Sequence, residues 1–399
     1  MALTKGHLSR LRRALRPHLA RGWERAVFAT PEQDGRRDER VSLGPGTEGP
    51  PGDAAIAALL ADAEAAAQAG YVKQTIVVDP RRRVQVDARH GHAQVRTLDD
   101  AAAAKVMGGK ERAFRPDESG ALLRAIGIMN ADGTISARHA RKYKQISHLA
   151  ELCRPTWERL TQARPGAPLR ILDLACGNAY LSFVLAESLR LAGLDLRLHG
   201  VDVRADVVER SRQRAAELGH QGISFAVSTI AAAAADAPAA LGGDADLIVA
   251  LHACDTATDE ALELAIAAGT PAVLAVPCCQ HELAAQLADR GRAAPSPLPA
   301  IAAHGLLRGA YADLLTDALR VDLLDACGYA VDVVEFVGSE HTAKNLLIRA
   351  HRRHPAAPVD PSRWRLGPLV ARCAELGVDP QLLRRLRARQ AAVAAGVST

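Results

Sequence analysis

Polar and nucleophilic side chains are concentrated in two short motifs, LHACDTATD at residues 251–259 and PCCQHE at residues 277–282. Each motif follows an apolar run with the pattern of a buried strand. In an open parallel sheet, ligands bind outside the carboxyl ends of the strands, so both motifs should face one cleft. Side chains of these types can move a proton or orient a substrate. The sequence therefore predicts a catalytic group made of His252, Asp255, Cys278, Cys279 and His281.

Other roles remain open for these side chains. The two histidines could orient loops by hydrogen bonding, and Asp255 or Thr256 could cap the helix predicted from about residue 258. Cys254, Cys278, Cys279 and His281 could converge on zinc, but adjacent cysteines lack the usual ligand spacing, so no metal is expected. Addition of a Cys254 or Cys278 thiolate to a pyrimidine ring is a further alternative.

A pattern of strand, turn and helix occupies residues 171–189, ILDLACGNAYLSFVLAESL. The strand ends at Asp173, and small residues follow it, so backbone N–H groups can approach a ligand at the helix N-terminus. A dinucleotide fingerprint needs three spaced glycines, and only Gly177 is present. The turn therefore fits the amino-acid end of S-adenosylmethionine better than a pyrophosphate, although an ordinary turn is the alternative. The expected contacts are Asp173, Ala175, Cys176, Gly177 and Asn178.

The next strands add further candidate contacts to this cofactor. Asp202 ends the second strand about 29 residues after Asp173, where a carboxylate can accept hydrogen bonds from both ribose hydroxyls. A helix-capping role is the alternative for Asp202. The third strand ends at Ser228 and Thr229, where many such enzymes have an acidic residue near the adenine. The cofactor-binding set is completed by Asp202, Val203, Thr229, Ile230 and His252.

The N-terminal part has a different pattern. Residues 1–30 are predicted to form a basic amphipathic helix, residues 31–53 a loop rich in glycine and proline, and residues 54–69 an alanine-rich helix. Two β-patterned runs, 74–80 and 83–89, predict a hairpin, and the run HAQVRTL extends it. We expect a small basic α+β domain over residues 1–105 and a helical bridge over residues 106–165.

From residue 169 onward, five apolar strands alternate with helices, which indicates a parallel sheet covered on both faces. Two last strands, 331–337 and 344–350, are separated by a loop too short for a crossover helix and should pair antiparallel. The predicted fold class is α/β, with a seven-stranded Rossmann-like methyltransferase sheet of five parallel strands plus an antiparallel terminal pair. This domain is expected over residues 166–352, with a helical appendage over residues 353–399.

Composition restricts the class of protein. The chain has 399 residues and a net charge of +5, which permits a polyanionic partner. Its seven cysteines are odd in number and irregularly spaced, unlike a secreted disulfide framework. No run approaches the roughly 18 apolar residues of a membrane span, and the N-terminus lacks an apolar signal core. We expect a cytoplasmic protein without a membrane partner, and the sequence predicts no stable protein partner.

The chain resembles a family of bacterial S-adenosylmethionine-dependent class I methyltransferases. The resemblance covers about residues 110–350 and rests on KYKQI at 142–146, DxxCGxxYL at 173–181, LHACDTATD, PCCQHE, and HTxKNLLIR at 341–349. The pairing of His-x-Cys with a later Cys-Cys-x-His is more distantly similar to eukaryotic tRNA ribose methyltransferases. The resemblance implies the fold and the cofactor, and it offers Lys142, Tyr143, Lys144 and Gln145 as a lid or as substrate contacts.

Three hypotheses for the activity follow. Methyl transfer to RNA, either tRNA or rRNA, would use the basic N-terminal part to hold phosphates. A small-molecule or protein methyltransferase would instead close the accessory domain over a pocket. A binding module could retain the fold without catalysis.

Overall fold

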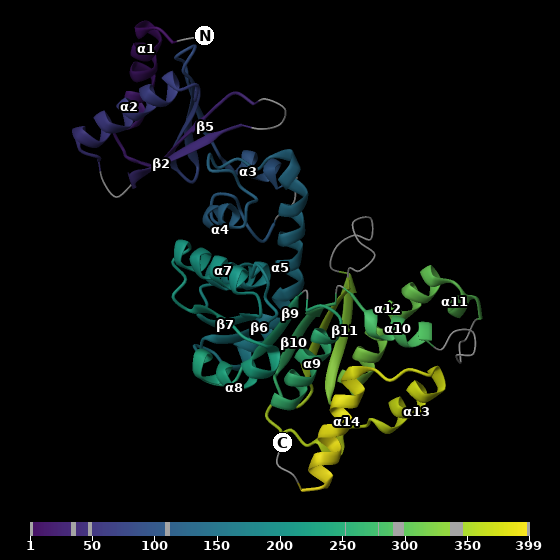
Figure 1. Ribbon diagram of the computed structural model, residues 1–399. Helices are drawn as coiled ribbons and strands as arrows, with labels where there is room; N and C mark the ends of the chain where they lie inside the picture. The colour runs from purple at the N-terminus through teal and green to yellow at the C-terminus, as the bar shows by residue number, and fades with distance from the viewer. Residues whose placement is uncertain are drawn as a thin grey trace. The chain divides into compact units, whose positions relative to one another are not determined.

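The computed structural model describes residues 3–32, 37–46, 50–107, 112–251, 253–277, 279–289, 299–335 and 346–396. The chain divides into two compact units, residues 1–147 and 148–399 (Figure 1). The domain boundaries expected at residues 105, 165 and 352 stay predictions. Within the described ranges, none of the helices combines the length and apolar character that a bilayer span needs.

The N-terminal unit contains a five-stranded antiparallel sheet in the order β2-β1-β3-β4-β5. Helices α1 (Lys5–Leu15) and α2 (Asp53–Gln68) pack against it, because their apolar stripes share one buried cluster with alternate strand residues such as Phe28 and Ile76. A short 3-10 turn, Arg16–His18, follows α1. The strands are β1 (Trp23–Ala29), β2 (Glu39–Gly46), β3 (Lys73–Asp79), β4 (Arg82–Asp87) and β5 (Ala93–Thr97).

Two expectations for this unit were wrong. The helix predicted over residues 1–30 ends at Leu15, and residues 23–29 form β1; the loop predicted over residues 31–53 contains β2. The reason is long-range pairing, since β1 bonds to both β2 and β3, which local pattern does not show. Gly44 permits this pairing, because a Cβ there would lie 1.9 Å from the Trp23 carbonyl oxygen. The hairpin of β3 and β4 is confirmed.

Three helices follow the first sheet. They are α3 (Asp100–Val106), α4 (Gly120–Ala125) and α5 (Ala137–Ala163). Residues 130–133 form a turn before α5, since the Asn130 carbonyl accepts the N–H of Gly133 at 3.0 Å and the Asn130 N–H donates to the Thr134 carbonyl. The basic first half of α5 begins directly after it.

The C-terminal unit contains the predicted seven-stranded sheet, in the order β11-β12-β10-β9-β6-β7-β8. Its neighbours are parallel except for β12, which lies antiparallel to both β10 and β11. The final two strands therefore pair antiparallel as expected, with the last one inserted inside the sheet. The strands are β6 (Leu169–Leu174), β7 (Leu196–Asp202), β8 (Ile223–Val227), β9 (Leu247–Leu251), β10 (Ala272–Val276), β11 (Tyr329–Glu335) and β12 (Leu346–Arg352).

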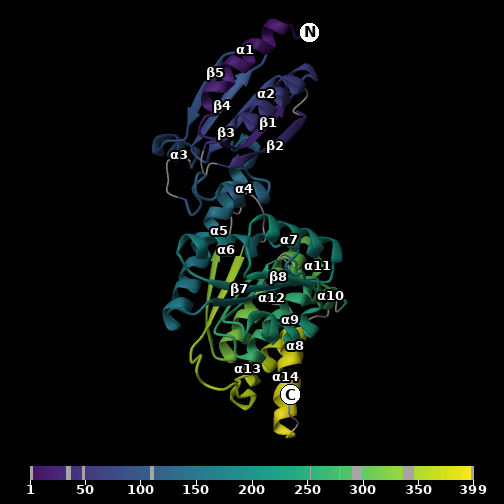
Figure 2. The same ribbon diagram turned by 90° about the vertical axis from the view of Figure 1, so that its left-hand side faces the viewer.

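The strand order places a topological switch between β6 and β9. The chain winds outward through β7 and β8, then returns to β9 on the other side of β6. Because parallel crossovers are right-handed, this reversal moves the connecting helices to the opposite face of the sheet. Figure 2 shows the unit turned by 90°. The helices before the reversal are α6 (Tyr180–Leu191) and α7 (Ala205–Glu217); those after it begin with α8 (Ile230–Leu241) and α9 (Thr256–Ala268).

The remaining helices complete the core of this unit. Leu382, Leu383 and Leu386 of the last helix are buried in the same cluster as strand residues of β6, β9 and β10. Ion pairs add to this packing, since Arg385 contacts Glu260 at 2.8 Å and Arg384 contacts Glu282 at 2.7 Å. The C-terminal helices thus belong to the sheet's own core. They are α10 (His281–Asp289), α11 (Pro299–Ala303), α12 (Gly305–Ala326), a 3-10 turn (Pro361–Arg363), α13 (Gly367–Leu376) and α14 (Gln381–Ala394).

Candidate functional site

The turn after β6 is built from small residues in a left-handed backbone conformation. Ala175, Gly177 and Ala179 have φ values of 54°, 54° and 53°, and Ala179 is the residue that precedes α6. Such values cost little for glycine and more for residues with a Cβ, so the turn is held by its surroundings. One such constraint is the hydrogen bond from the Cys176 N–H to the Val201 carbonyl, 2.9 Å. The turn thus stays tight between two neighbouring strands.

Asp202 lies at the end of β7 and faces this turn. Its Oδ2 accepts the Gly177 N–H at 2.9 Å, and its Oδ1 accepts the Arg204 N–H and Nε–H, both at 3.0 Å. Burial alone would raise the pKa of Asp202, but the hydrogen bonds from Arg204 and Gly177 hold it below its ordinary value. A carboxylate that stays ionised therefore meets the turn at the carboxyl ends of β6 and β7.

Asp173 is buried beneath the same turn. One carboxyl oxygen, Oδ2, accepts a hydrogen bond from the Ser182 hydroxyl of α6, while Oδ1 has no partner among the residues that the structure describes. Burial raises the pKa of Asp173 to about 7, and the nearby negative charge of Asp202 contributes to the rise. An incompletely satisfied buried acid is costly, so Asp173 is a candidate for a functional position.

The floor below the turn leaves no room for larger side chains. A Cβ at Gly200, in the middle of β7, would lie 2.5 Å from the Phe225 ring and 3.3 Å from the Cys176 sulfur. Burial raises the pKa of the Cys176 thiol well above its usual range, with the charges of Asp173 and Asp202 adding to the effect. The Cys176 thiol is therefore neutral near pH 7, and it packs below the turn.

Other predicted cofactor contacts lie around the same strand ends. Thr229 caps α8 by accepting the Ala232 N–H at 3.2 Å, and the Ile230 side chain is buried. Val203 is 66% exposed directly after Asp202, which gives an apolar surface beside the carboxylate. Asn178 is exposed, and its carbonyl oxygen accepts a hydrogen bond from Arg214 of α7 at 2.9 Å.

Asp255 joins the loops that follow β9 and β10. Its Oδ1 accepts the N–H groups of His281 at 2.8 Å and Glu282 at 3.1 Å, so it caps α10. Its own N–H donates to the Cys279 carbonyl at 3.1 Å. Asp255 also precedes α9 with a φ of 51°, but its side chain makes no capping bond to that helix. The expected capping alternative thus involves a different helix, and the structure gives Asp255 a positioning role.

A buried ionic cluster supports this pair of loops, and it was not anticipated from the sequence. Arg320 of α12 donates from Nε to Asp259 at 2.7 Å, from Nη1 to Asp317 at 3.1 Å, and from Nη2 to the Asp255 carbonyl at 2.8 Å. Gln280 donates to Asp317 at 2.9 Å. Burial raises the pKa of both aspartates, while Arg320 opposes the shift. Asp259 and Gln280 stand in the two motifs, but Arg320 lies outside any motif, so no sequence signal marks it.

The structure describes three of the five predicted catalytic residues, namely Asp255, Cys279 and His281. Cys279 is half-buried and His281 is exposed at the start of α10, while Cys254 is exposed after β9. His252 and Cys278 lie outside the described residues, as do His341, Thr342, Lys344 and Asn345. Among the described residues, no three His, Cys, Asp or Glu side chains are grouped to hold a metal ion. The catalytic roles assigned to these residues stay predictions.

The KYKQI motif lies in the part of α5 that belongs to the N-terminal unit. Tyr143 is buried and donates its hydroxyl to the Phe114 carbonyl at 2.5 Å, so it holds α5 against the preceding segment. Lys142 and Lys144 are exposed, and Gln145 is half-buried. Tyr143 is thus a packing residue, and the two lysines remain accessible to a partner.

The family comparison matches the part of the chain that contains this site. Residues 141–286 match the model of a methyltransferase domain, from α5 through β10 and into α10. The chain carries a methyltransferase domain. With its strand order, this methyltransferase domain is of the S-adenosylmethionine-dependent class I type, and S-adenosylmethionine is its cofactor.

Solved structures give low overall similarity. The ribosomal protein L11 methylase of Lactobacillus delbrueckii subsp. bulgaricus is 13% identical, with 53% of this chain and 80% of that one covered at a TM-score of 0.32. The magnesium protoporphyrin IX methyltransferase of Synechocystis PCC 6803 is 15% identical, with 58% and 93% covered and a TM-score of 0.32. The rRNA methylase of Streptococcus thermophilus is 13% identical, with 53% and 96% covered and a TM-score of 0.30.

Likenesses at this level carry no inference about the acceptor of this methyltransferase domain. No curated protein sequence matches the chain.

The residues around the turn fit the cofactor chemically. Asp202 offers an ionised carboxylate beside exposed Val203, and Asp173 offers a buried carboxyl oxygen that none of the described residues contacts by a hydrogen bond. The hydroxyls of the ribose need a hydrogen-bond acceptor such as the Asp202 carboxylate, and the adenine ring needs an apolar surface such as Val203. The left-handed turn lets backbone N–H groups approach a ligand closely.

Proposed function

We propose that this methyltransferase acts on RNA, either tRNA or rRNA. When bound, S-adenosylmethionine supplies an electrophilic methyl group. Asp202 would hold the ribose, Val203 and Ile230 would contact the adenine, and the turn from Ala175 to Asn178 would receive the amino-acid end. For the ribose to reach Asp202, the Arg204 side chain has to release one of the carboxyl oxygens that it now contacts.

The observation that supports an RNA substrate is the exposed basic run at the start of α5. Arg138, Arg141, Lys142 and Lys144 are all exposed within seven residues, and their helix carries no acidic residue in its first turn. Phosphate contacts from such side chains dominate RNA affinity and make it dependent on salt. The chain's net charge of +5 acts in the same direction.

The loops after β9 and β10 would position the acceptor. Asp255 and Arg320 fix the backbone of both loops at the same sheet edge as Asp202. Holding two reactants in a fixed geometry is the main contribution that a protein makes to such a transfer. Proton removal from the acceptor is assigned to His252, one of the two residues that the sequence predicts for it, because the Asp255 carboxylate holds the start of α10.

RNA binding tests this proposal directly. The double variant Arg138→Ala/Arg141→Ala should bind total tRNA about tenfold more weakly, and its affinity should fall less steeply with salt, because each lost phosphate contact removes about 0.9 from the salt slope. The control, Arg210→Ala/Arg372→Ala, changes the net charge equally and should keep its affinity. Both controls are exposed ion-paired residues of the C-terminal unit.

The acceptor itself is tested by nucleoside mass spectrometry. Total RNA from cells with and without the gene should differ in one methylated nucleoside. An identical set of nucleosides, together with methyl transfer to a protein or small molecule in an extract, would contradict an RNA substrate.

A further inference from the structure

A separate pocket of about 300 Å³ lies in the C-terminal unit, at the end of the sheet opposite to Asp202. It is lined by the ends of α9, α12 and β12 and by the segment that leads to α13. His351 pairs with Ala272, the first residue of β10, so the end of β12 lies at the amino ends of the parallel strands. Asp202 and Asp255 lie at the carboxyl ends. The pocket is therefore distinct from the methyl-transfer site.

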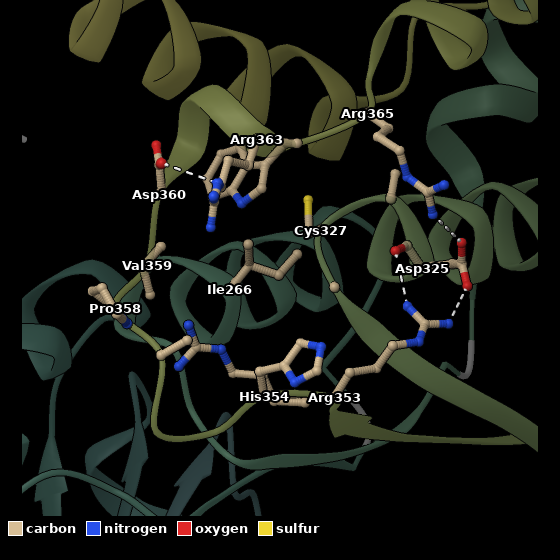
Figure 3. Close-up of a pocket in the computed structure, with 15 residues that line it drawn as sticks. Ile266, Asp325, Cys327, Arg353, His354, Pro358, Val359, Asp360, Arg363 and Arg365 are labelled. Atoms are coloured by element: carbon tan, nitrogen blue, oxygen red, sulfur yellow. Dashed lines mark hydrogen bonds and ion pairs between the residues drawn. The ribbon is translucent and has the colours of Figure 1, made fainter.

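The middle of the pocket is apolar. Ile266 of α9 and Cys327 at the end of α12 lie between its two sides, and Val359 adds a further apolar side chain (Figure 3). Burial raises the pKa of the Cys327 thiol to about 12, so the thiol is neutral. An uncharged floor of this kind favours a flat or apolar part of a ligand.

The rim of the pocket is cationic. On one side Arg353 and Arg365 share a single carboxylate, Asp325, at 2.6 Å and 3.4 Å; on the other side Arg363 contacts Asp360 at 3.7 Å (Figure 3). The lining contains four arginines and two aspartates, which leaves an excess of two positive charges. The fourth arginine, at residue 352, donates to the carbonyls of residues 269 and 355 and is structural.

Two of the rim arginines can change partner at little cost. The side chains of Arg363 and Arg365 are 84% and 73% exposed, and their contacts with acids are the longest of the group. Exposed ion pairs contribute little to stability, since water competes for both charges. An anion that binds guanidinium groups more strongly than these aspartates could therefore contact both Arg363 and Arg365 without unfolding the segment that leads to α13.

We infer that this pocket binds a nucleoside 5′-monophosphate, either free or as the first nucleotide of an RNA strand. The guanidinium groups of Arg353, Arg363 and Arg365 approach from two sides and suit a phosphate, whose oxygens accept in several directions, better than a planar carboxylate. The base would lie on Ile266 and Cys327. A volume near the lower limit for ligand pockets, about 300 Å³, is enough for a single nucleotide.

Calorimetry with the full chain tests this inference. Uridine 5′-monophosphate is the probe, and saturating S-adenosylhomocysteine is present so that the nucleotide cannot enter the cofactor site. We expect saturable binding of the monophosphate and binding at least about tenfold weaker for uridine and for inorganic phosphate, because each lacks half of the contacts. Equal affinity for uridine and its monophosphate would overturn the inference.

Two variants locate the binding. The double variant Arg363→Ala/Arg365→Ala should bind uridine 5′-monophosphate about tenfold more weakly, or weaker still. The control Arg190→Ala/Arg210→Ala removes the same charge elsewhere in the unit and should keep the affinity of the wild type. Ala357→Trp fills the pocket without a charge change and should abolish binding. Binding of S-adenosylhomocysteine should be unchanged in each variant, which shows that the chain remains folded. Full affinity in both pocket variants would overturn the inference.

RNA distinguishes the two sources of the ligand. A short RNA with a 5′-phosphate that displaces uridine 5′-monophosphate, when the same RNA with a 5′-hydroxyl does not, identifies the RNA end as the ligand. If neither displaces it while the nucleotide still binds, the ligand is a free nucleotide. Both results support the site, and equal displacement by the two RNAs would contradict recognition of a terminal phosphate.

Discussion

The backbone N–H of Gly177 donates a hydrogen bond to Asp202 Oδ2 at 2.9 Å, which ties the turn after β6 to the end of β7. Twenty-five residues separate the two in sequence. Gly177 has a left-handed φ of 54°, and the bond holds the Asp202 carboxylate against the turn. One hydrogen bond therefore connects the shape of the turn to the charge beside it.

Asp202→Ala should weaken binding of S-adenosylmethionine about tenfold to a hundredfold, because a charge-assisted acceptor is lost. Calorimetry measures the affinity, and thermal unfolding checks that the fold persists. Asp206→Ala is the matched control, since Asp206 is an exposed aspartate of α7 paired with Arg210. Unchanged affinity in the Asp202 variant would remove this residue from the cofactor site.

Asp173→Asn should change how stability depends on pH. The pKa of Asp173 is raised to about 7 in the folded state, so its protonated form contributes stability at low pH that is lost as pH rises toward 7. The free energy of unfolding of the wild type, relative to the variant, should therefore fall by a few kcal/mol at most between about pH 4 and pH 7. Urea unfolding at several pH values measures this. If the free energy of unfolding depended on pH in the same way in the two proteins, the raised pKa of Asp173 would be contradicted.

The two roles open to Asp255 are separated by a pair of substitutions. Asp255→Ala should lower stability by about 1 to 2 kcal/mol, because α10 loses its cap, whereas Asp255→Asn keeps an oxygen acceptor and most of the stability. Methyl transfer to total RNA is the second measurement. We expect the asparagine variant to remain active, as a positioning role requires. A loss of about a hundredfold at unchanged stability would instead identify Asp255 as the base.

Arg320→Met should destabilise the C-terminal unit by about 3 to 5 kcal/mol, because Asp259 and Asp317 would stay buried without their cation. The loss should be smaller at low pH, where both acids are protonated in the folded state. Urea midpoints measure the effect. Arg372→Met breaks an exposed pair with Asp322 and should cost less than about 1 kcal/mol. Equal losses in the two variants would show that the cluster adds nothing to stability.

The sequence alone determined most of the C-terminal sheet. Its strands are near-continuous apolar runs, and the short loop before β12 required antiparallel pairing, so the local pattern and the chain length together fixed the order of elements. The positions of Asp173 and Asp202 followed, because each lies near the end of a strand that local pattern identifies, and Gly177 lies in the turn after the first of these strands. The turn predicted to bind the cofactor, residues 175–178, was found from the same pattern of strand followed by helix.

Tertiary structure decided what local pattern does not contain. The strand β1 was predicted as helix because its place in the sheet depends on pairing with β2 and with the more distant β3, which local pattern does not show. The bond from the His281 N–H to Asp255 joins residues 26 positions apart, and the bond from Arg320 to the Asp255 carbonyl joins residues 65 positions apart. The basic pocket likewise joins the end of α9 to the segment after β12. Such contacts depend on how packed elements meet in space, and side-chain spacing along one element says nothing about them.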